Sequence, residues 1–91
     1  MIRLNAFVQT EEKNRQQIIT LAKQLVEKSR QDAGCISYDF FASTTTPTVF
    51  MFCETWADQS SIDNHAPTHH FQTLVGEIEK LGTMKLEKLN F

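Results

Sequence analysis

The sequence predicts one α+β domain in which a strand and a helix are followed by two strands, a second helical region and a last strand. Three observations support this order. Apolar residues alternate over residues 2–9, they recur every three or four positions over 15–31, and two aromatic-rich stretches flank a turn-prone segment at 43–48. These elements take up nearly all of the 91 residues, so we expect a single domain over 1–91.

The first two elements are marked by the period of their apolar residues. Residues 2–9 have the two-residue period of a strand, with Ile2, Leu4, Ala6 and Val8 on one side. A helix is expected over 15–31, with Asn14 and Gln17 as a capping box and Gly34 as its stop. The apolar stripe of this helix comprises Ile18, Leu21, Ala22, Leu25 and Val26.

A β-hairpin is expected next, from the stretches 35–42 and 49–56, which are rich in aromatic and β-branched residues. With the turn centred between Thr45 and Thr46, Cys35 lies opposite Trp56. Cys53 then lies opposite Tyr38 on the other face of the hairpin. This register excludes a disulfide between the two cysteines of the chain.

The last third of the chain reads as helix and then strand. A helical segment is expected over 59–64 after the cap Asp58, and another from Pro67 to the stop at Gly82. The second has an apolar face of Phe71, Leu74, Val75, Ile78 and Leu81. The final strand carries Met84, Leu86, Leu89 and Phe91, whose alternation changes phase once and predicts a β-bulge.

The order βαββαβ with right-handed crossovers predicts a ferredoxin-like fold, a four-stranded antiparallel sheet with its helices on one face. The hairpin is nevertheless apolar on both faces. Phe50, Phe52 and Trp56 share one face, and Val49, Met51 and Cys53 share the other. A chain this short has no residues left to cover the second face, so we expect a homodimer in which a second copy covers it.

Composition excludes several classes of function. The longest apolar run is residues 49–53, far below the ~20 residues that cross a membrane. A net charge of −2 with scattered basic residues gives no footprint for nucleic acid. The first twelve residues lack a secretion signal and the cysteines lack a CxxC spacing, so a reducing cytoplasm is expected. The three glycines are too far apart for a phosphate-binding loop, and no bound cofactor is expected.

The candidate residues for a functional site lie between positions 54 and 71. Glu54 and Trp56 lie at the end of a predicted strand and point to the same side of it. A helix starting at Pro67 would bring Phe71 above these two side chains. We therefore expect a cleft there, with histidines at its rim. The alternative is that Trp56 is core, that the histidines are surface residues, and that Glu54 pairs with a lysine. The lysines available to it are Lys85 and Lys88.

A metal site is not expected among these histidines. His65 and His69 have the one-turn spacing of a helical metal pair, but Pro67 interrupts the helix between them. A third ligand is not evident in the sequence.

The segment CETWADQSSIDNHAPTHHF, with Gly34-Cys35 before it and a strand near Arg3 to Val8, resembles the antibiotic biosynthesis monooxygenase family, close to its quinol monooxygenase-like members. The most specific part is E-x-W at 54–56, followed nine residues later by His65 and then by His70-Phe71. The resemblance covers nearly the whole chain. It implies a ferredoxin-like subunit that dimerises sheet against sheet into a dimeric α/β barrel.

The resemblance also implies an activity, the oxidation of a small phenolic or quinol-type aromatic substrate by O₂ without flavin, haem or metal. Within it, His65 is the expected base, because an unperturbed histidine titrates near neutral pH. Asn5 or His70 would hydrogen-bond the substrate oxygen. The expected pocket walls and substrate-binding residues are Trp56, Phe71, Phe52 and Glu54.

Other activities within the wider superfamily remain as alternatives or are disfavoured. Haem degradation would use a histidine one turn beyond Phe71, where this chain has Val75, which cannot ligate iron. Another branch of the superfamily, which this sequence resembles at the motif H-x₄-H-F over residues 65–71, processes a phosphorylated signalling sugar. Arg3 and Lys85 could bind the phosphate of such a substrate. A non-catalytic dimeric protein that binds a small molecule in the same cavity is the third possibility, and the sequence does not separate it from an enzyme.

Overall fold

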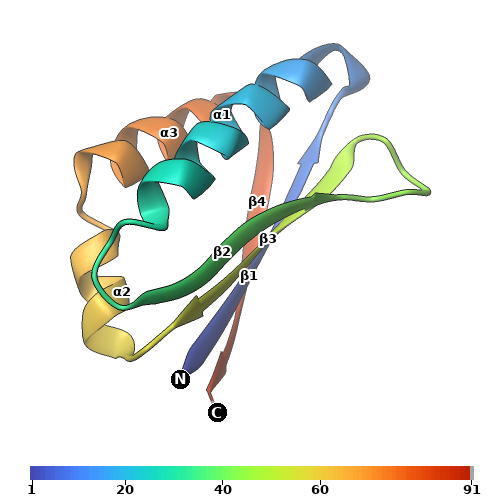
Figure 1. The fold of residues 1–91 in the computed structure, drawn as a ribbon. Helices are drawn as coiled ribbons and strands as arrows, with labels where there is room; N and C mark the ends of the chain where they lie inside the picture. Colours follow the sequence, from blue (N-terminus) through green and yellow to red (C-terminus); the bar gives the residue numbers. More distant parts are fainter. Residues whose placement is uncertain (91) are drawn as a thin grey trace.

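The computed structural model describes residues 1–90 and has the predicted order of strands and helices (Figure 1). Its elements are β1 (Ile2–Thr10), a 3-10 turn η1 (Glu12–Asn14), α1 (Arg15–Ser29), β2 (Cys35–Ala42), β3 (Val49–Trp56), α2 (Gln59–His65), α3 (His69–Leu81) and β4 (Gly82–Asn90). The strands form one antiparallel sheet in the order β2-β3-β1-β4. This is the ferredoxin-like α+β fold.

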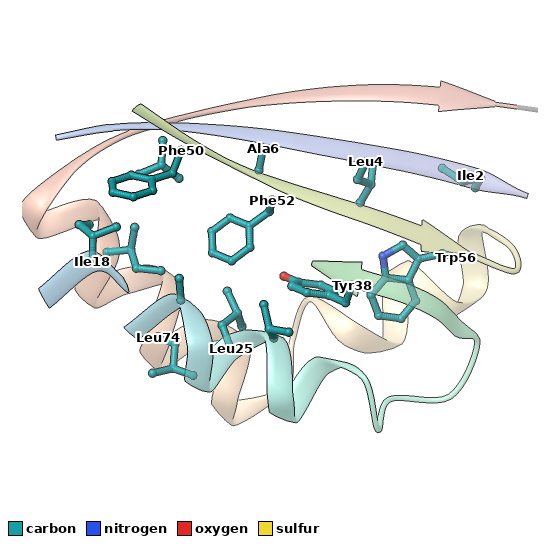
Figure 2. Packing of buried hydrophobic residues seen from close by; sticks show 14 residues of the cluster. Ile2, Leu4, Ala6, Ile18, Leu25, Tyr38, Phe50, Phe52, Trp56 and Leu74 are labelled. Atoms are coloured by element: carbon teal, nitrogen blue, oxygen red, sulfur yellow. The ribbon is translucent and has the colours of Figure 1, made fainter. Parts of the chain in front are cut away.

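The sheet has one covered face and one open face. Figure 1 shows α1 and α3 side by side across one face, with α2 at the end where β3 stops. Even-numbered residues of β1 and β3 point toward the helices and form most of the core with Ile18, Leu25 and Ile78 (Figure 2). Odd-numbered residues of the same strands lie on the open face, where Phe7 is 41% exposed.

The helix boundaries differ from the sequence-based prediction in three places. Asn14 makes no capping hydrogen bond, because η1 precedes the helix and the Asn14 side chain instead contacts the Leu81 carbonyl oxygen at 3.4 Å. α1 ends at Ser29 rather than residue 31. α3 begins two residues after Pro67, because the Thr68 side chain is its cap and accepts a hydrogen bond from the Phe71 backbone N–H.

The predicted bulge in the last strand is wrong. Within residues 1–90, β4 pairs with β1 in one unbroken register from Gly82 opposite Thr10 to Asn90 opposite Ile2. The change in apolar phase means instead that Leu86 lies on the helix side and Leu89 on the open side. Phe91 lies outside the described residues.

A bulge does occur in β2, between Cys35 and Ser37. Cys35 pairs with Trp56 as predicted, but the extra residue shifts the rest of the strand by one position. Cys53 therefore lies opposite Asp39, and Tyr38 lies opposite Glu54 on the helix side, which corrects the predicted Cys53–Tyr38 pair. Both cysteines are free thiols. None of the helices described is long and apolar enough to cross a membrane.

Candidate active site

A cavity of about 310 Å³ lies between the helix side of the sheet and the helices α2 and α3. Its sheet wall includes Leu4, Ala6 and Phe52, and its helix wall includes Ile62, Phe71 and Val75. Polar groups are few. They are the carboxyls of Glu54 and Glu79, the Tyr38 hydroxyl and the His65 imidazole. This composition suits a small, largely apolar molecule with one or two polar groups.

His65 is the last residue of α2 and is 2% exposed. Its ring packs against three aromatic rings, with centroid distances of 4.6 Å to Trp56, 4.8 Å to Phe71 and 5.8 Å to Tyr38. The Nδ1 atom lies 2.6 Å from Oδ2 of Asp32. Nε2 is buried and has no hydrogen-bond partner within residues 1–90.

These contacts fix the protonation state of His65. A carboxylate oxygen only accepts, so we assign the ring proton to Nδ1 and a free lone pair to Nε2. Burial lowers the pKa of His65, and the Asp32 carboxylate opposes this effect only in part. The imidazole is therefore a neutral base at neutral pH. Asp32 holds its Nδ1–H, and its Nε2 lone pair has no hydrogen-bond partner within residues 1–90.

Asp32 is held by the turn between α1 and β2. Gly34 has φ +83° in this turn, and a Cβ there would lie 1.8 Å from Oγ of Ser61 in α2. Only glycine allows this close approach, which holds the turn against α2. The same Oδ2 of Asp32 also lies 2.8 Å from Nε2 of His70. One carboxylate oxygen thus joins two histidines from two helices.

Glu54 is the second titratable group buried at the cavity, with 5% of its surface exposed. Its Oε1 accepts a hydrogen bond from Nε1–H of Trp56 at 2.9 Å. Burial raises the pKa of Glu54 to about 7, and the hydrogen bonds from Trp56 and Tyr38 oppose only part of that rise. The carboxyl therefore changes charge close to physiological pH.

Glu54 does not pair with either lysine named as its alternative partner. Lys88 contacts the Gln59 side chain instead. Lys85 lies opposite Phe7 in the register and therefore on the open face. Within residues 1–90 no salt bridge includes Glu54.

Four of the predicted site residues line the cavity together, namely Phe52, Glu54, His65 and Phe71. The others lie elsewhere. Trp56 is fully buried behind His65 and Glu54 rather than in the wall. His70 does not line the cavity, but it contacts Asp32 and its ring lies 6.0 Å from the ring of His65.

Asn5 does not reach the cavity. It lies on the open face of β1, where its Nδ2 donates to Oε1 of Glu87 at 3.2 Å. The expectation that Asn5 contacts a substrate in the cavity of its own chain is therefore corrected. The reason is the two-residue period of the strand, since Leu4 and Ala6 on either side of it point into the cavity.

The three donor atoms of Asp32, His65 and His70 lie within 4.8 Å of one another and could hold a metal ion. This is not the His65–His69 pair considered from the sequence, because His69 is exposed. The two nitrogen–oxygen distances are those of charge-assisted hydrogen bonds, so a metal would have to displace both N–H protons. The absence of a metal site stays a prediction.

Comparison with known proteins identifies the family of this chain. The family model described as antibiotic biosynthesis monooxygenase matches residues 1–77. The chain belongs to the antibiotic biosynthesis monooxygenase family.

Similar proteins carry related descriptions. A Bacillus subtilis protein named "Putative monooxygenase YcnE" is 30% identical over 87 residues, which cover 96% of this chain and 92% of that protein. A solved structure from Bacteroides thetaiotaomicron, described as a conserved protein of unknown function and possible oxidoreductase, is 48% identical with a TM-score of 0.97, covering 99% of this chain and 96% of the other. A crystal structure described as antibiotic biosynthesis monooxygenase is 29% identical with a TM-score of 0.94, covering 100% and 98%.

An uncharacterized Synechocystis protein is 34% identical over 61 residues. That match covers 67% of this chain and 42% of the Synechocystis protein. The family membership predicted from E-x-W, His65 and His70-Phe71 is thus confirmed, and the names support a monooxygenase-like role.

Two residues of this site, Asp32 and Tyr38, were not predicted from the sequence. Asp32 contacts His65 and His70 across 33 and 38 positions of the chain, and no local pattern marks it. Tyr38 lines the cavity because of the bulge in β2. Figure 2 shows its hydroxyl pointing away from Trp56, into the space between Phe52 and Leu25.

Proposed function

We propose that this protein is a cofactor-independent monooxygenase that oxidises a small, uncharged phenol or quinol with O₂ in the cavity beside His65. One observation carries the proposal. The His65 imidazole is buried at the cavity, its Nδ1 is fixed by Asp32, and its Nε2 is free to take a proton. This is the geometry of a positioned general base with an orienting carboxylate.

The chemistry needs little more than a base and a dry pocket. Removing the proton of a phenolic hydroxyl gives an anion that is electron-rich enough to reduce O₂. A quinol and O₂ together give a hydroxyquinone and water, so the substrate supplies all the electrons and no external reductant is needed. Phe52 and Phe71 provide apolar walls for the ring and limit the access of water to the anion.

The lining of the cavity favours an uncharged substrate over a phosphorylated sugar. It includes no lysine or arginine among the residues described, while Glu54 and Glu79 are both present. Arg3 and Lys85, the cations considered for a phosphate, lie on the opposite face of the sheet. A phosphate in this cavity would meet carboxyl groups and no compensating charge.

Oxygen uptake with a panel of hydroquinones tests the proposal. We expect uptake by the wild type, a decrease of ~10² to 10⁴ in kcat for His65→Ala, and little change for His69→Ala. His69 is the matched control because it is an exposed histidine at the start of α3. Binding of hydroquinones without oxygen uptake would instead identify a non-catalytic binding protein, and full activity of His65→Ala would refute the assigned base.

We also propose that the protein is a homodimer in which a second copy covers the open face. Phe7, Met51 and Phe41 lie in one row across β1, β3 and β2, and Phe41 is 53% exposed. Together with Val49 they line a shallow apolar groove. An exposed apolar row of this kind, left uncovered by residues 1–90, favours an interface between copies.

Light scattering tests the dimer. We expect twice the mass of the chain for the wild type and for Gln24→Asp, which adds the same charge on the exposed side of α1. Met51→Asp should lower the mass or prevent folding, because it places an unpaired charge in a buried surface. A wild type that is monomeric at micromolar concentration would refute the proposal.

A further inference from the structure

We propose that Glu54 is a second catalytic residue of this site, the acid that gives a proton to the oxygen atom leaving as water. This inference rests on the proposed monooxygenase function. It assigns the second half of the reaction to a residue on the sheet wall, while His65 on the helix wall performs the first half.

Trp56 holds the two groups close together. The His65 ring packs on the indole at a centroid distance of 4.6 Å, and the Glu54 carboxyl accepts the indole N–H at 2.9 Å. Both side chains therefore touch the same buried indole, and both line the same cavity. A small aromatic molecule beside Phe71 could contact the imidazole and the carboxyl at once.

The surroundings of Glu54 favour the protonated form of its carboxyl. The titratable groups that face it are Tyr38 and Cys35 from β2, His65 from α2 and Glu79 from α3, and none of these carries a fixed positive charge. Lys88 of β4 lies in the same row of the sheet, but it is exposed and contacts Gln59. Burial without a cation favours the neutral acid, in line with the raised pKa of about 7.

The reaction has a step that requires such an acid. After His65 takes the hydroxyl proton, the anion forms a C–O bond with O₂ at a ring carbon, and the proton returns to the outer oxygen. The product is a hydroperoxide that still has one hydrogen on the same carbon. To complete the oxidation, that C–H proton must leave, its electron pair must form a C=O bond, and the O–O bond must break.

The two residues divide this second step between them. His65, neutral again, removes the C–H proton, and Glu54 protonates the departing hydroxide so that it leaves as water. The proton on His65 then passes back to Glu54. In total one quinol and one O₂ give one hydroxyquinone and one water, and both residues return to their starting states.

Glu54→Gln is the informative variant, because glutamine keeps an oxygen for the Trp56 hydrogen bond but has no acidic proton. The matched control is Glu27→Gln, the same change at an exposed carboxyl of α1 that does not line the cavity. Reactions with ¹⁸O₂ would be followed by oxygen uptake and by mass spectrometry of the organic products. We expect Glu54→Gln to take up O₂ but to form hydroxyquinone at least ~10²-fold more slowly, with the ¹⁸O-labelled hydroperoxide accumulating. Glu27→Gln should behave as the wild type.

The outcomes separate this inference from the proposed function. A wild type that consumes no O₂ with any quinol refutes the proposed function. Oxygen uptake by the wild type, with unchanged hydroxyquinone formation and no hydroperoxide in Glu54→Gln, refutes only the role of Glu54. If Glu54→Gln does not fold, the wild type provides the test, because its hydroperoxide fraction should rise as the pH passes the region where Glu54 ionises. A constant product ratio across neutral pH would then overturn the inference.

Discussion

Replacing Glu54 by glutamine should remove a loss of stability that the wild type shows as the pH rises from about 4.5 to about 7. Burial raises the pKa of Glu54 from 4.5 to about 7. The folded protein therefore binds this proton more tightly than the unfolded chain does. The stabilisation from protonation is complete below the unfolded pKa and is lost as the pH rises through the folded pKa.

The size of the effect follows from the shift. At about 1.4 kcal/mol per pH unit, the rise from 4.5 to about 7 corresponds to about 3 kcal/mol of lost stability in the wild type. Glutamine does not titrate. The difference in free energy of unfolding between Glu54→Gln and the wild type should therefore change by about 3 kcal/mol, in favour of the variant, between about pH 4 and about pH 8.5.

Urea unfolding followed by the fluorescence of the buried Trp56 measures this difference at equal protein concentrations. Burial also lowers the pKa of His65, but His65 is present in both proteins and its contribution cancels in the comparison. Glu79→Gln, at an exposed position, should show a nearly constant difference from the wild type. A difference for Glu54→Gln that is also independent of pH would refute the claim that this carboxyl is buried and costly to ionise.

Three further predictions concern the residues around the site. Asp32→Asn should lower kcat by ~10² or more with little change in KM, because the neutral amide no longer fixes the His65 tautomer, and steady-state kinetics would show this split. Gly34→Ala should lower the free energy of unfolding by at least ~1 kcal/mol, because φ is +83° and the added methyl group meets α2, and an unchanged urea midpoint would contradict it. Trp56→Phe removes the N–H bound to Glu54, so the pKa of that carboxyl should rise and the alkaline limb of the pH–kcat profile should move to higher pH.

The strands and their faces could be predicted because alternation in the sequence maps directly onto the two sides of a sheet. The alternation in β1 already predicted that Asn5 lies on the side of the sheet away from Leu4 and Ala6, and the structure confirms this. The substrate contact that the family resemblance implied for Asn5 is not found in the cavity of its own chain. Pairing across the hairpin was harder. The bulge after Cys35 moves Tyr38 to the cavity side, and a bulge of one residue has no reliable mark in a single sequence.

The site was predictable only where its residues are close in the chain. Glu54, His65 and Phe71 fall within eighteen residues of one another, and their elements have clear boundaries. Asp32 belongs to a different part of the sequence, and its place beside His65 depends on how the turn before β2 packs on α2. Such a contact follows from tertiary packing, which no local periodicity encodes.

The alternation of β3 interleaves two separate surfaces in one short strand. Phe52 and Glu54 belong to the cavity, while Met51 and Cys53, which alternate with them, belong to the opposite face. Point substitutions can therefore alter either surface without touching the other. A deletion of a single residue at the start of the strand, with the preceding register kept, would move the later residues to the other face and put Glu54 outside and Met51 inside. Natural variants of this segment should thus differ by substitution and keep its length, because both surfaces depend on the same count of residues.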